Sequence, residues 1–254
     1  MITIKSRTEI ELMKKAGEIT AAAHKLIEDA IRPGITTLEL DRIAEEFIHK
    51  NRAVPSFKGY QGIPGAPDYP ASTCISVNNE VVHGIPGLRT LKDGDIVSID
   101  IGVYCNGFHA DAARTHPVGN VAKEAIRLIE VTRQSFYEGI CHAKEGNRII
   151  DISAAIQDYV EKNGYSVVRE YVGHGIGEEM HEQPQIPNYR TRERGPRLEQ
   201  GMTLAIEPMV NEGRPGVRLL DNKWTVVTAD GSLSAHYENT IAITGNEPEI
   251  LTKL

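Results

Sequence analysis

The chain has 254 residues, of which 40% are hydrophobic and 25% are charged, so it is long enough to bury a substantial core and is expected to be globular. Its formal net charge of -7 argues against a general affinity for nucleic acid or anionic lipid, and no stable nucleic-acid or membrane partner is expected. Cys74, Cys105 and Cys141 are odd in number, far apart and free of a CxxC pattern, which argues against disulfides and a thiolate zinc site and indicates reduced thiols.

The N-terminal segment lacks the features of a signal peptide. Residues 1–15 contain no uninterrupted apolar stretch, and nowhere do about eighteen apolar residues follow one another as a membrane span requires. A cytoplasmic location is therefore expected. Residues 9–30 instead carry apolar side chains at helical spacing and are followed by Arg32-Pro33-Gly34, which predicts an amphipathic helix that ends there.

Three further helices follow in chain order. Thr36 and Glu39 have the spacing of a capping box, and Asn120 is a residue type suited to a helix N-cap. Between the helices the pattern is that of strands and turns, and the Gly and Pro residues of segment 61–71 predict a surface loop near the functional site. The expected helix limits are Thr36 to Asn51, Asn120 to Ile140, and about Ile150 to Asn163.

The two halves of the chain resemble each other in the order of their elements. Residues 91–100, LKDGDIVSID, align with residues 198–207, LEQGMTLAIE, so that an acid and a glycine recur at equal spacing. We infer a degenerate duplication, with halves of about 1–118 and 119–254 within one domain of residues 1–254. Neither half alone would cover both faces of its strands, which predicts an α/β protein with a shared sheet and a cleft between the halves.

Residues 99–111 have the pattern of a β-hairpin, with Asn106-Gly107 at the positive-φ positions of a type I′ turn. This turn sets the register, so that Asp111 faces Gly102 and Asp100 lies diagonal to Asp111 on the same side. The two backbones would then lie roughly 7 to 8 Å apart at these acids. The carboxylates are expected to converge on cations, for which Gly102 would leave room.

Glu207 and Glu238 lie in apolar, strand-like surroundings, where an isolated acid is unfavourable. At a spacing of about 4 Å, each carboxylate pair repels by roughly 4 kcal/mol at an effective dielectric constant near 20, so four clustered acids require two divalent cations. Separate pairing with Lys or Arg at the surface would explain any one acid but not the set. A His between glycines, such as His174, is alone more often a turn residue, but beside four acids it is the expected nitrogen ligand. This donor set suits Mn, Fe(II), Co or Zn.

Six segments of the chain are HGIP at 83–86, DGDIVSIDIG at 93–102, GFHADAART at 107–115, GHGIG at 173–177, IEPM at 206–209 and ENT at 238–240. In order and over nearly the whole chain, they resemble motifs of the type I methionine aminopeptidases. That family has the pita-bread fold, in which two pseudo-symmetric halves pack helices on a shared, curved, mainly antiparallel sheet. The resemblance implies removal of the N-terminal methionine of nascent proteins when the second residue is small. We expect a monomer that contacts the ribosome transiently.

The resemblance also implies the roles of individual residues in the metal site. A hydroxide held between the two cations would attack the first peptide carbonyl. Asp100, Asp111 and Glu238 would contact the metals with two oxygens or as bridges. His174 would bind one metal, and Glu207 would bind one metal beside the nucleophile and act as the proton shuttle.

The same resemblance places other residues around the substrate. His83 would lie near the leaving nitrogen, and His181 would donate a hydrogen bond to the scissile carbonyl oxygen. Tyr60, Cys74 and Trp224 would line the methionine pocket.

The chain departs from the family pattern near this pocket. Met180 stands where an aromatic residue usually precedes His181, Ala205 stands where Thr is frequent, and loop 61–71 is longer than usual. His236 lies on the same strand face as Glu238, and we expect it to hydrogen-bond a carboxylate rather than bind metal. A hairpin turn at Asp230-Gly231 would put Trp224 opposite Tyr237.

Three alternatives share parts of this pattern. Proline-specific peptidases of the same fold, such as aminopeptidase P or prolidase, carry a large extra N-terminal domain, whereas the first helix here begins by about Glu9. Type II methionine enzymes carry a helical insertion, yet only 25 residues separate His181 from Glu207. A non-catalytic relative that grips nascent chains or ribosomes would lose ligands, and all five are present. The type I enzymes therefore fit best.

Overall fold

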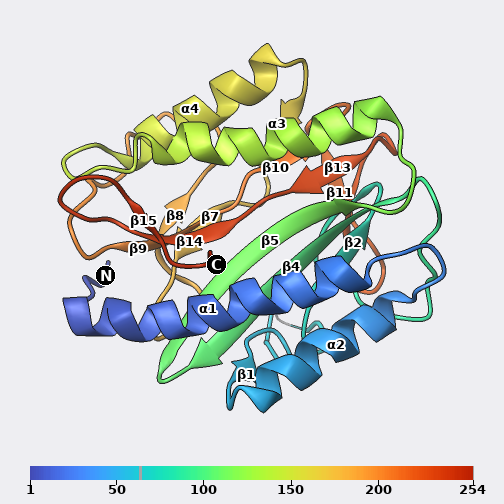
Figure 1. Ribbon diagram of the computed structural model, residues 1–254. Coiled ribbons are helices and arrows are strands. Elements are labelled where there is room, and N and C mark those ends of the chain that lie inside the picture. The colour runs from blue at the N-terminus through green and yellow to red at the C-terminus, as the bar shows by residue number, and fades with distance from the viewer. Residues whose placement is uncertain (63–64, 254) are drawn as a thin grey trace.

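Two pairs of helices and a set of antiparallel strands make up the structure, a computed structural model that describes residues 1–62 and 65–253. In Figure 1 the pair α1 and α2 lies below the strands and the pair α3 and α4 lies above them. The predicted α/β class with mainly antiparallel strands is confirmed. The helices are α1 (Arg7–Ala30), α2 (Thr37–Lys50), α3 (Lys123–Ile140) and α4 (Ile149–Lys162).

The first two helices begin at capping boxes. At α2 the Thr36 side chain accepts from the Glu39 N–H at 3.2 Å while the Thr36 N–H donates to the Glu39 carboxylate at 2.8 Å, as predicted. The start of α1 has the same device, in which the Ser6 side chain accepts from the Glu9 N–H at 3.3 Å. The sequence contains this Ser-x-x-Glu spacing, so it could have shown that α1 begins at Arg7, two residues before the predicted start.

The third helix begins differently. The predicted cap at Asn120 is wrong, because α3 begins after Ala122 and has no side-chain cap. Asn120 instead donates its backbone N–H to Asp93 Oδ1 at 2.8 Å, which holds it in the turn before the helix. The last helix, α4, lies within a residue of its predicted limits at both ends. None of the described helices combines the length and the apolar character needed to cross a membrane.

Hydrogen bonds arrange the described strands in four sheets, and the pairs are antiparallel. The strand orders are β1-β4-β2 with β5 on β4, β13-β10-β6, β11-β12-β3, and β15-β14-β9-β7-β8. The strands are β1 (Val54–Pro55), β2 (Cys74–Val77), β3 (Glu80–Val82), β4 (Ile96–Cys105), β5 (Phe108–Pro117), β6 (Ser166–Val167), β7 (Gly173–Gly175), β8 (Glu182–Ile186), β9 (Thr203–Ile206), β10 (Met209–Asn211), β11 (Val217–Leu219), β12 (Val226–Thr228), β13 (Ser234–His236), β14 (Asn239–Ala242) and β15 (Glu249–Ile250).

Backbone hydrogen bonds connect these sheets across the two halves of the chain. The Ala113 N–H donates to the Glu238 carbonyl at 3.3 Å, and the Glu238 N–H donates to the Ala113 carbonyl at 2.9 Å. This exchange joins β5 of the first half to the residue before β14 of the second. The expected shared sheet is therefore a set of linked ladders, and the connection passes through a predicted metal ligand.

The β4–β5 hairpin has the predicted register. Gly102 pairs with Asp111 and Asp100 pairs with Ala113, so that Asp100 and Asp111 are diagonal neighbours. Asn106 and Gly107 have φ values of 54° and 89°, as a type I′ turn requires. The two acids of the first half are thus positioned by a turn that the sequence specifies locally.

The second predicted hairpin is wrong. Gly231 does lie in a turn with a φ of 78°, but β12 pairs with β11 and β3, whereas β13 pairs with β10. Trp224 and Tyr237 are consequently not opposite each other in a hairpin. The Trp224 ring meets the rings of Tyr69 and His83, and Tyr237 lies in the core beneath α3.

Each half has a core between its own helices and strands. Ile27 and Leu40 of the first helix pair pack with Ile99 of β4, and Leu128 and Phe136 of α3 pack with strands of the second half. A further apolar cluster takes residues from both halves and lies beneath the candidate site. Its buried members are Met13, Phe57, Tyr69, Ala71, Cys74, Phe108, Ile176, Met180, Ala205, Trp224, Ala242 and Leu251.

Candidate metal centre

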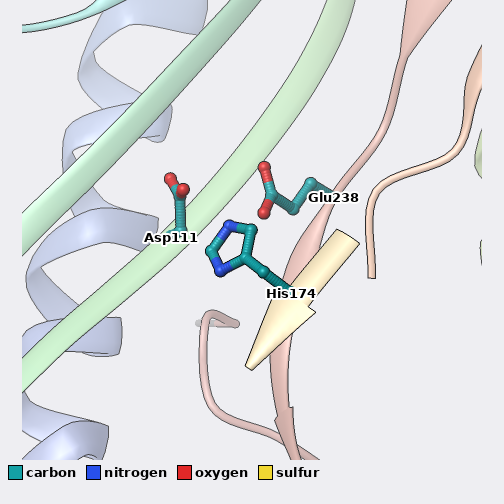
Figure 2. A group of neighbouring side chains, drawn as sticks. All are labelled: Asp111, His174 and Glu238. Atoms are coloured by element: carbon teal, nitrogen blue, oxygen red, sulfur yellow. The ribbon is translucent and has the colours of Figure 1, made fainter. Parts of the chain in front are cut away.

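The five predicted ligands come from both halves of the chain and line one cavity of about 350 Å³. Asp100 and Asp111 project from the hairpin β4–β5, and His174 is the middle residue of β7. Glu207 directly follows β9, and Glu238 directly precedes β14. Figure 2 shows Asp111, His174 and Glu238 turned toward one another. The linked sheets therefore bring together residues that are up to 138 positions apart in the sequence, from Asp100 to Glu238.

Two glycines set the position of His174. A Cβ atom on Gly173 would lie 2.4 Å from the Ala205 carbonyl oxygen, and one on Gly175 would lie 2.3 Å from the Gln183 carbonyl oxygen. The two neighbouring strands thus lie too close to β7 for a side chain at either Gly173 or Gly175. The His174 Nδ1–H donates to the Gly175 carbonyl at 2.8 Å, which leaves Nε2 to face Glu207 Oε1 at 3.6 Å. Burial lowers the pKa of His174 to about 3, so the ring offers a bare nitrogen.

Asp111 and Glu238 are buried, Asp100 and Glu207 are partly buried, and within the described residues none of the four forms an ion pair with Lys or Arg. Asp100 Oδ1, Asp111 Oδ1 and Glu238 Oε1 are enclosed and have no hydrogen-bond partner. Burial raises the pKa of Asp111 to about 7. Burial, followed by repulsion from Asp111, also raises the pKa values of Asp100, Glu207 and Glu238 well above the usual range. Without a cation these groups would therefore hold protons near neutral pH.

The donor set fits divalent cations. One ligand atom each from Asp111, His174 and Glu238 lie within 4.8 Å of one another, and the same holds for Glu207, His236 and Glu238. Carboxylate oxygens that lack hydrogen-bond donors, together with a bare imidazole nitrogen, are the ligands that such cations take. The two groups share Glu238, so it could contact cations on both sides. Which residues coordinate metal stays a prediction.

The prediction that Gly102 leaves room for cations is wrong. A Cβ atom there would lie 2.8 Å from Ser56 Cβ, 3.0 Å from Phe57 Cε1 and 3.2 Å from Met180 Cε. The space opposite Asp111 is thus occupied by these side chains and is not open to cations. Met180 fills part of this space as a buried, flexible thioether.

His236 lies beside the acids, on the expected face, but does not make the predicted hydrogen bond. Its Nε2 is 3.8 Å from Glu207 Oε2 and 3.9 Å from Glu238 Oε2, and it has no hydrogen-bond partner. Burial lowers the pKa of His236 to about 3, which keeps the ring neutral. Strand alternation placed this residue on the correct face, but the distance to its neighbours depends on the pairing of β13 with β10.

The two other predicted histidines also line the cavity. His83 has a left-handed backbone with a φ of 58°, and its ring meets those of Tyr171 and Trp224 edge-on at centroid distances of 5.5 and 6.3 Å. Burial lowers its pKa to about 4. The centroid of the His181 ring lies 4.3 Å from that of His174, and Nδ1 lies 2.7 Å from the hydroxyl of Tyr60. The positive φ of His83 is a strained conformation for a residue other than glycine, and such strain is frequent at functional sites.

Aromatic side chains form the other end of the cavity. Tyr60, Cys74 and Trp224 line it as expected, and Phe57 and Tyr69, which sequence analysis did not name, line it too. The Trp224 Nε1–H donates to the Pro67 carbonyl at 2.9 Å. The wall is therefore built mainly from rings, and Trp224 is held by a hydrogen bond to the 61–71 loop.

Loop 61–71 lies at the surface beside the cavity, as predicted, and it also contributes a buried side chain. Positions 63–64 lie outside the described residues, and the described part packs against the cavity wall. Tyr69 is 2% exposed and donates its hydroxyl to the Gly84 carbonyl at 2.8 Å. A Cβ atom on Gly62 would lie 2.4 Å from the Trp224 ring. Tyr69 could have been identified as an aromatic residue within a Gly- and Pro-rich loop.

Arg114 supports the site from the other side of the sheet and was also not named from the sequence. Its guanidinium donates to the Glu238 backbone carbonyl and, at 2.6 Å, to Asn239 Oδ1. The guanidinium carbon lies 4.4 Å from the centroid of the Tyr237 ring. Arg114 thus fixes the backbone of one carboxylate, and its place in the segment GFHADAART was the available indication.

Known proteins resemble this chain in sequence and in fold. The family described as metallopeptidase family M24 matches residues 11–245. The chain is 61% identical over 252 residues to a methionine aminopeptidase of Clostridium perfringens, covering 99% of both chains. It superposes on a methionine aminopeptidase of Thermotoga maritima with a TM-score of 0.95 and 48% identity, covering 100% of both. A prolidase from Pyrococcus furiosus shares the fold with a TM-score of 0.78 at 24% identity, but only 65% of that chain is covered.

Proposed function

We propose how this chain carries out its reaction, given that it belongs to metallopeptidase family M24 and, within that family, groups with the methionine aminopeptidases. Its fold is the pita-bread fold predicted from the sequence. The chain is accordingly a metal-dependent aminopeptidase that removes the N-terminal methionine of nascent proteins. One observation carries the chemical proposal, namely the buried cluster of carboxylates with unpartnered oxygens beside a bare histidine nitrogen.

We propose that the cluster holds two divalent cations. Asp100, Asp111, His174, Glu207 and Glu238 would be the ligands, and two cations would balance the charge of the four carboxylates. When bound, such cations lower the pKa of water towards about 7 and polarise a carbonyl group. The metals suited to this donor set are Mn, Fe(II), Co and Zn, and metal availability would choose among them.

The remaining polar groups of the cavity would act directly on the substrate. Glu207, which lies beside His174 and His236, would carry a proton from the attacking water to the leaving nitrogen. His181 would donate a hydrogen bond to the carbonyl oxygen as negative charge develops there. His83, which also lines the cavity, would contact the leaving nitrogen.

The aromatic end of the cavity would bind the methionine side chain. Tyr60, Cys74 and Trp224, with Phe57 and Tyr69, surround a space suited to an unbranched thioether. Their crowding around the first residue would leave little space at the second. Peptides with a small second residue should therefore be the substrates.

We also propose where and how the protein works. Nascent chains are made in the cytosol, and the three free cysteines Cys74, Cys105 and Cys141 agree with a reducing compartment. A monomer that contacts the ribosome transiently would have access to emerging N-termini.

Metal removal tests the proposed chemistry. Chelator should abolish methionine release from a Met-Ala peptide, and Co(II), Mn(II) or Fe(II) should restore it. Asp111→Asn should behave like the metal-stripped protein, because it removes one charge from the cluster. Metal content measured alongside methionine release checks both, and full activity of Asp111→Asn at ordinary metal concentrations would contradict the ligand assignment.

Substrate preference tests the proposed pocket. Peptides that begin Met-Ala, Met-Gly or Met-Ser should be cleaved, and those that begin Met-Leu or Met-Lys should not. The matched control is a set of Xaa-Pro peptides with different first residues. Cleavage of that set in preference to Met-Ala would favour a proline-specific peptidase of the same fold.

A further inference from the structure

The ring of His181 is exposed to the cavity, and the phenol of Tyr60 is the hydrogen-bond partner that the described structure gives it. Tyr60 Oη lies 2.7 Å from His181 Nδ1, and the ring centroids are 5.1 Å apart. One nitrogen of His181 is thus engaged by Tyr60, which leaves Nε2 for the substrate. An exposed ring without this contact could rotate freely about its side-chain bonds.

The direction of this hydrogen bond follows from what His181 has to contact. A neutral imidazole carries one N–H and one bare nitrogen, and the partner of one nitrogen decides the state of the other. A scissile carbonyl oxygen only accepts hydrogen bonds, so His181 can stabilise it only with the proton on Nε2. Nδ1 must then accept, and the Tyr60 O–H must donate to it. The opposite arrangement would turn a bare nitrogen toward the substrate oxygen.

The backbone holds the Tyr60 ring in a defined place. The Tyr60 N–H donates to the Phe57 carbonyl at 2.9 Å, and the Tyr60 carbonyl accepts from the Tyr69 N–H at 2.9 Å. The Gly59 N–H donates to the Tyr69 carbonyl at 2.8 Å, so both ends of the 61–68 segment are joined beside Tyr60. Tyr69 is itself tied to the Gly84 carbonyl by its hydroxyl. Tyr60 is therefore suited to hold another side chain in place.

We propose that Tyr60 is a positioning residue that fixes the tautomer and the orientation of His181, beyond its contact with the methionine side chain. The hydroxyl donates to Nδ1, so Nε2 carries the proton and faces the carbonyl oxygen of the first peptide bond. This inference rests on the proposed function, because it assigns a hydrogen bond in that reaction. It gives the phenol oxygen and the phenol ring separate roles.

Kinetics of Tyr60→Phe test this separation of roles. The variant keeps the ring but loses the donor, so kcat should fall roughly fivefold to tenfold, as expected for one ordinary hydrogen bond, while KM changes less than twofold. If Tyr60 only lined the pocket, the more apolar ring would leave kcat unchanged or alter KM alone. Either of these results would overturn the proposal.

A double-mutant cycle shows whether the effect passes through His181. In the His181→Ala background, Tyr60→Phe should no longer lower kcat, because the hydroxyl has lost its acceptor. Tyr69→Phe is the matched control, since it removes a hydroxyl from a neighbouring ring that bonds backbone carbonyls instead. Its effect should be the same factor in both backgrounds. An equal effect of Tyr60→Phe in both backgrounds would contradict a role through His181.

Nitrogen NMR gives a readout that does not depend on activity. In zinc-loaded protein with ¹⁵N-labelled histidine, the His181 resonances, assigned by their loss in His181→Ala, should show a protonated Nε2 and a hydrogen-bonded, bare Nδ1. Tyr60→Phe should shift Nδ1 toward the value of a free acceptor. A protonated Nδ1 in the parent protein would overturn the proposal. A parent protein that releases no methionine would instead contradict the proposed function, and the tautomer would still be measured.

Discussion

At the scale of single residues, the rings of His174 and His181 are in contact and both use Nδ1 for a hydrogen bond, but their partners differ. His174 turns Nε2 toward Glu207 and donates from Nδ1 to its neighbouring backbone, as a ligand held in one orientation would. His181 uses Nδ1 for a tyrosine hydroxyl. Substitution of the two histidines should therefore lower activity for different reasons.

Alanine at each position tests this difference. His174→Ala should bind less metal and recover part of its rate when excess metal is added, because its defect is one of occupancy. His181→Ala should keep its metal but lose a transition-state donor, at a cost of about 2.7 to 4 kcal/mol, or roughly a hundredfold to a thousandfold in kcat. Metal analysis and steady-state kinetics check both variants. A His181→Ala protein that loses metal, or that added metal rescues, would show that its role is misassigned.

Which residue positions could be predicted depended on how local their causes are. The places of Asp100 and Asp111 follow from a two-residue turn within their own hairpin, and the structure has that register. The reason for Gly102 could not be predicted, because the atoms that exclude a side chain there belong to Phe57 and Met180. Local geometry was available in the sequence, and the packing of distant segments was not.

At the scale of elements, β7 is confined between β8 and β9 more tightly than any side chain at its glycines allows. Its neighbours on both sides are backbone atoms, which cannot rotate away as a side chain can. Gly173 and Gly175, which flank His174, therefore allow β8 and β9 to pack closely enough to hold this strand in place. Its geometry should be sensitive to a single added methyl group.

Gly175→Ala tests this confinement. The added methyl would lie 2.3 Å from the Gln183 carbonyl oxygen, so β7 and β8 must separate, at a cost of about 1 to 3 kcal/mol or more. Gly216→Ala is the control, because its methyl would meet only Ala229 Cβ at 3.8 Å, an ordinary contact. Urea unfolding and metal content should both suffer in Gly175→Ala alone. Equal behaviour of the two variants would refute the argument.

Elements were predicted well where a periodic pattern or a cap defines them, and poorly where a distant partner does. The helices appear near their expected limits, since each carries its own apolar stripe. The turn at Gly231 is present, but a turn does not determine which strands its flanks join. Those flanks pair with β3, β10 and β11, which come from other parts of the chain.

At the scale of the whole molecule, several histidines are buried or partly buried in neutral form. Burial lowers the pKa values of His83, His109 and His116 to about 4 and those of His174 and His236 to about 3. The unfolded chain would protonate them near pH 6.5. Below that pH the unfolded state binds more protons than the folded state, so these groups favour unfolding as the pH falls. The acid cluster, whose pKa values are raised, acts in the opposite direction.

His116 allows one such contribution to be isolated, because it lies outside the metal centre, where Glu28, Arg114 and Lys25 are the charges that act on it. Its stabilising contribution is present above about pH 6.5 and is lost as the pH falls through about 4. His116→Gln should therefore gain stability relative to the parent protein between pH 6.5 and 4.5. Urea unfolding of both proteins at several pH values measures the difference. Parallel pH curves would show that His116 does not titrate as described.

The proposed ligands are divided between the halves, with Asp100 and Asp111 in the first and His174, Glu207 and Glu238 in the second. On this assignment the cations cross-link the halves, and a ligand that binds only the folded state adds stability by mass action. A cell starved of divalent metal would then lose the protein to proteolysis as well as its activity. Returning the metal would not restore processing at once, because recovery would have to wait for new synthesis.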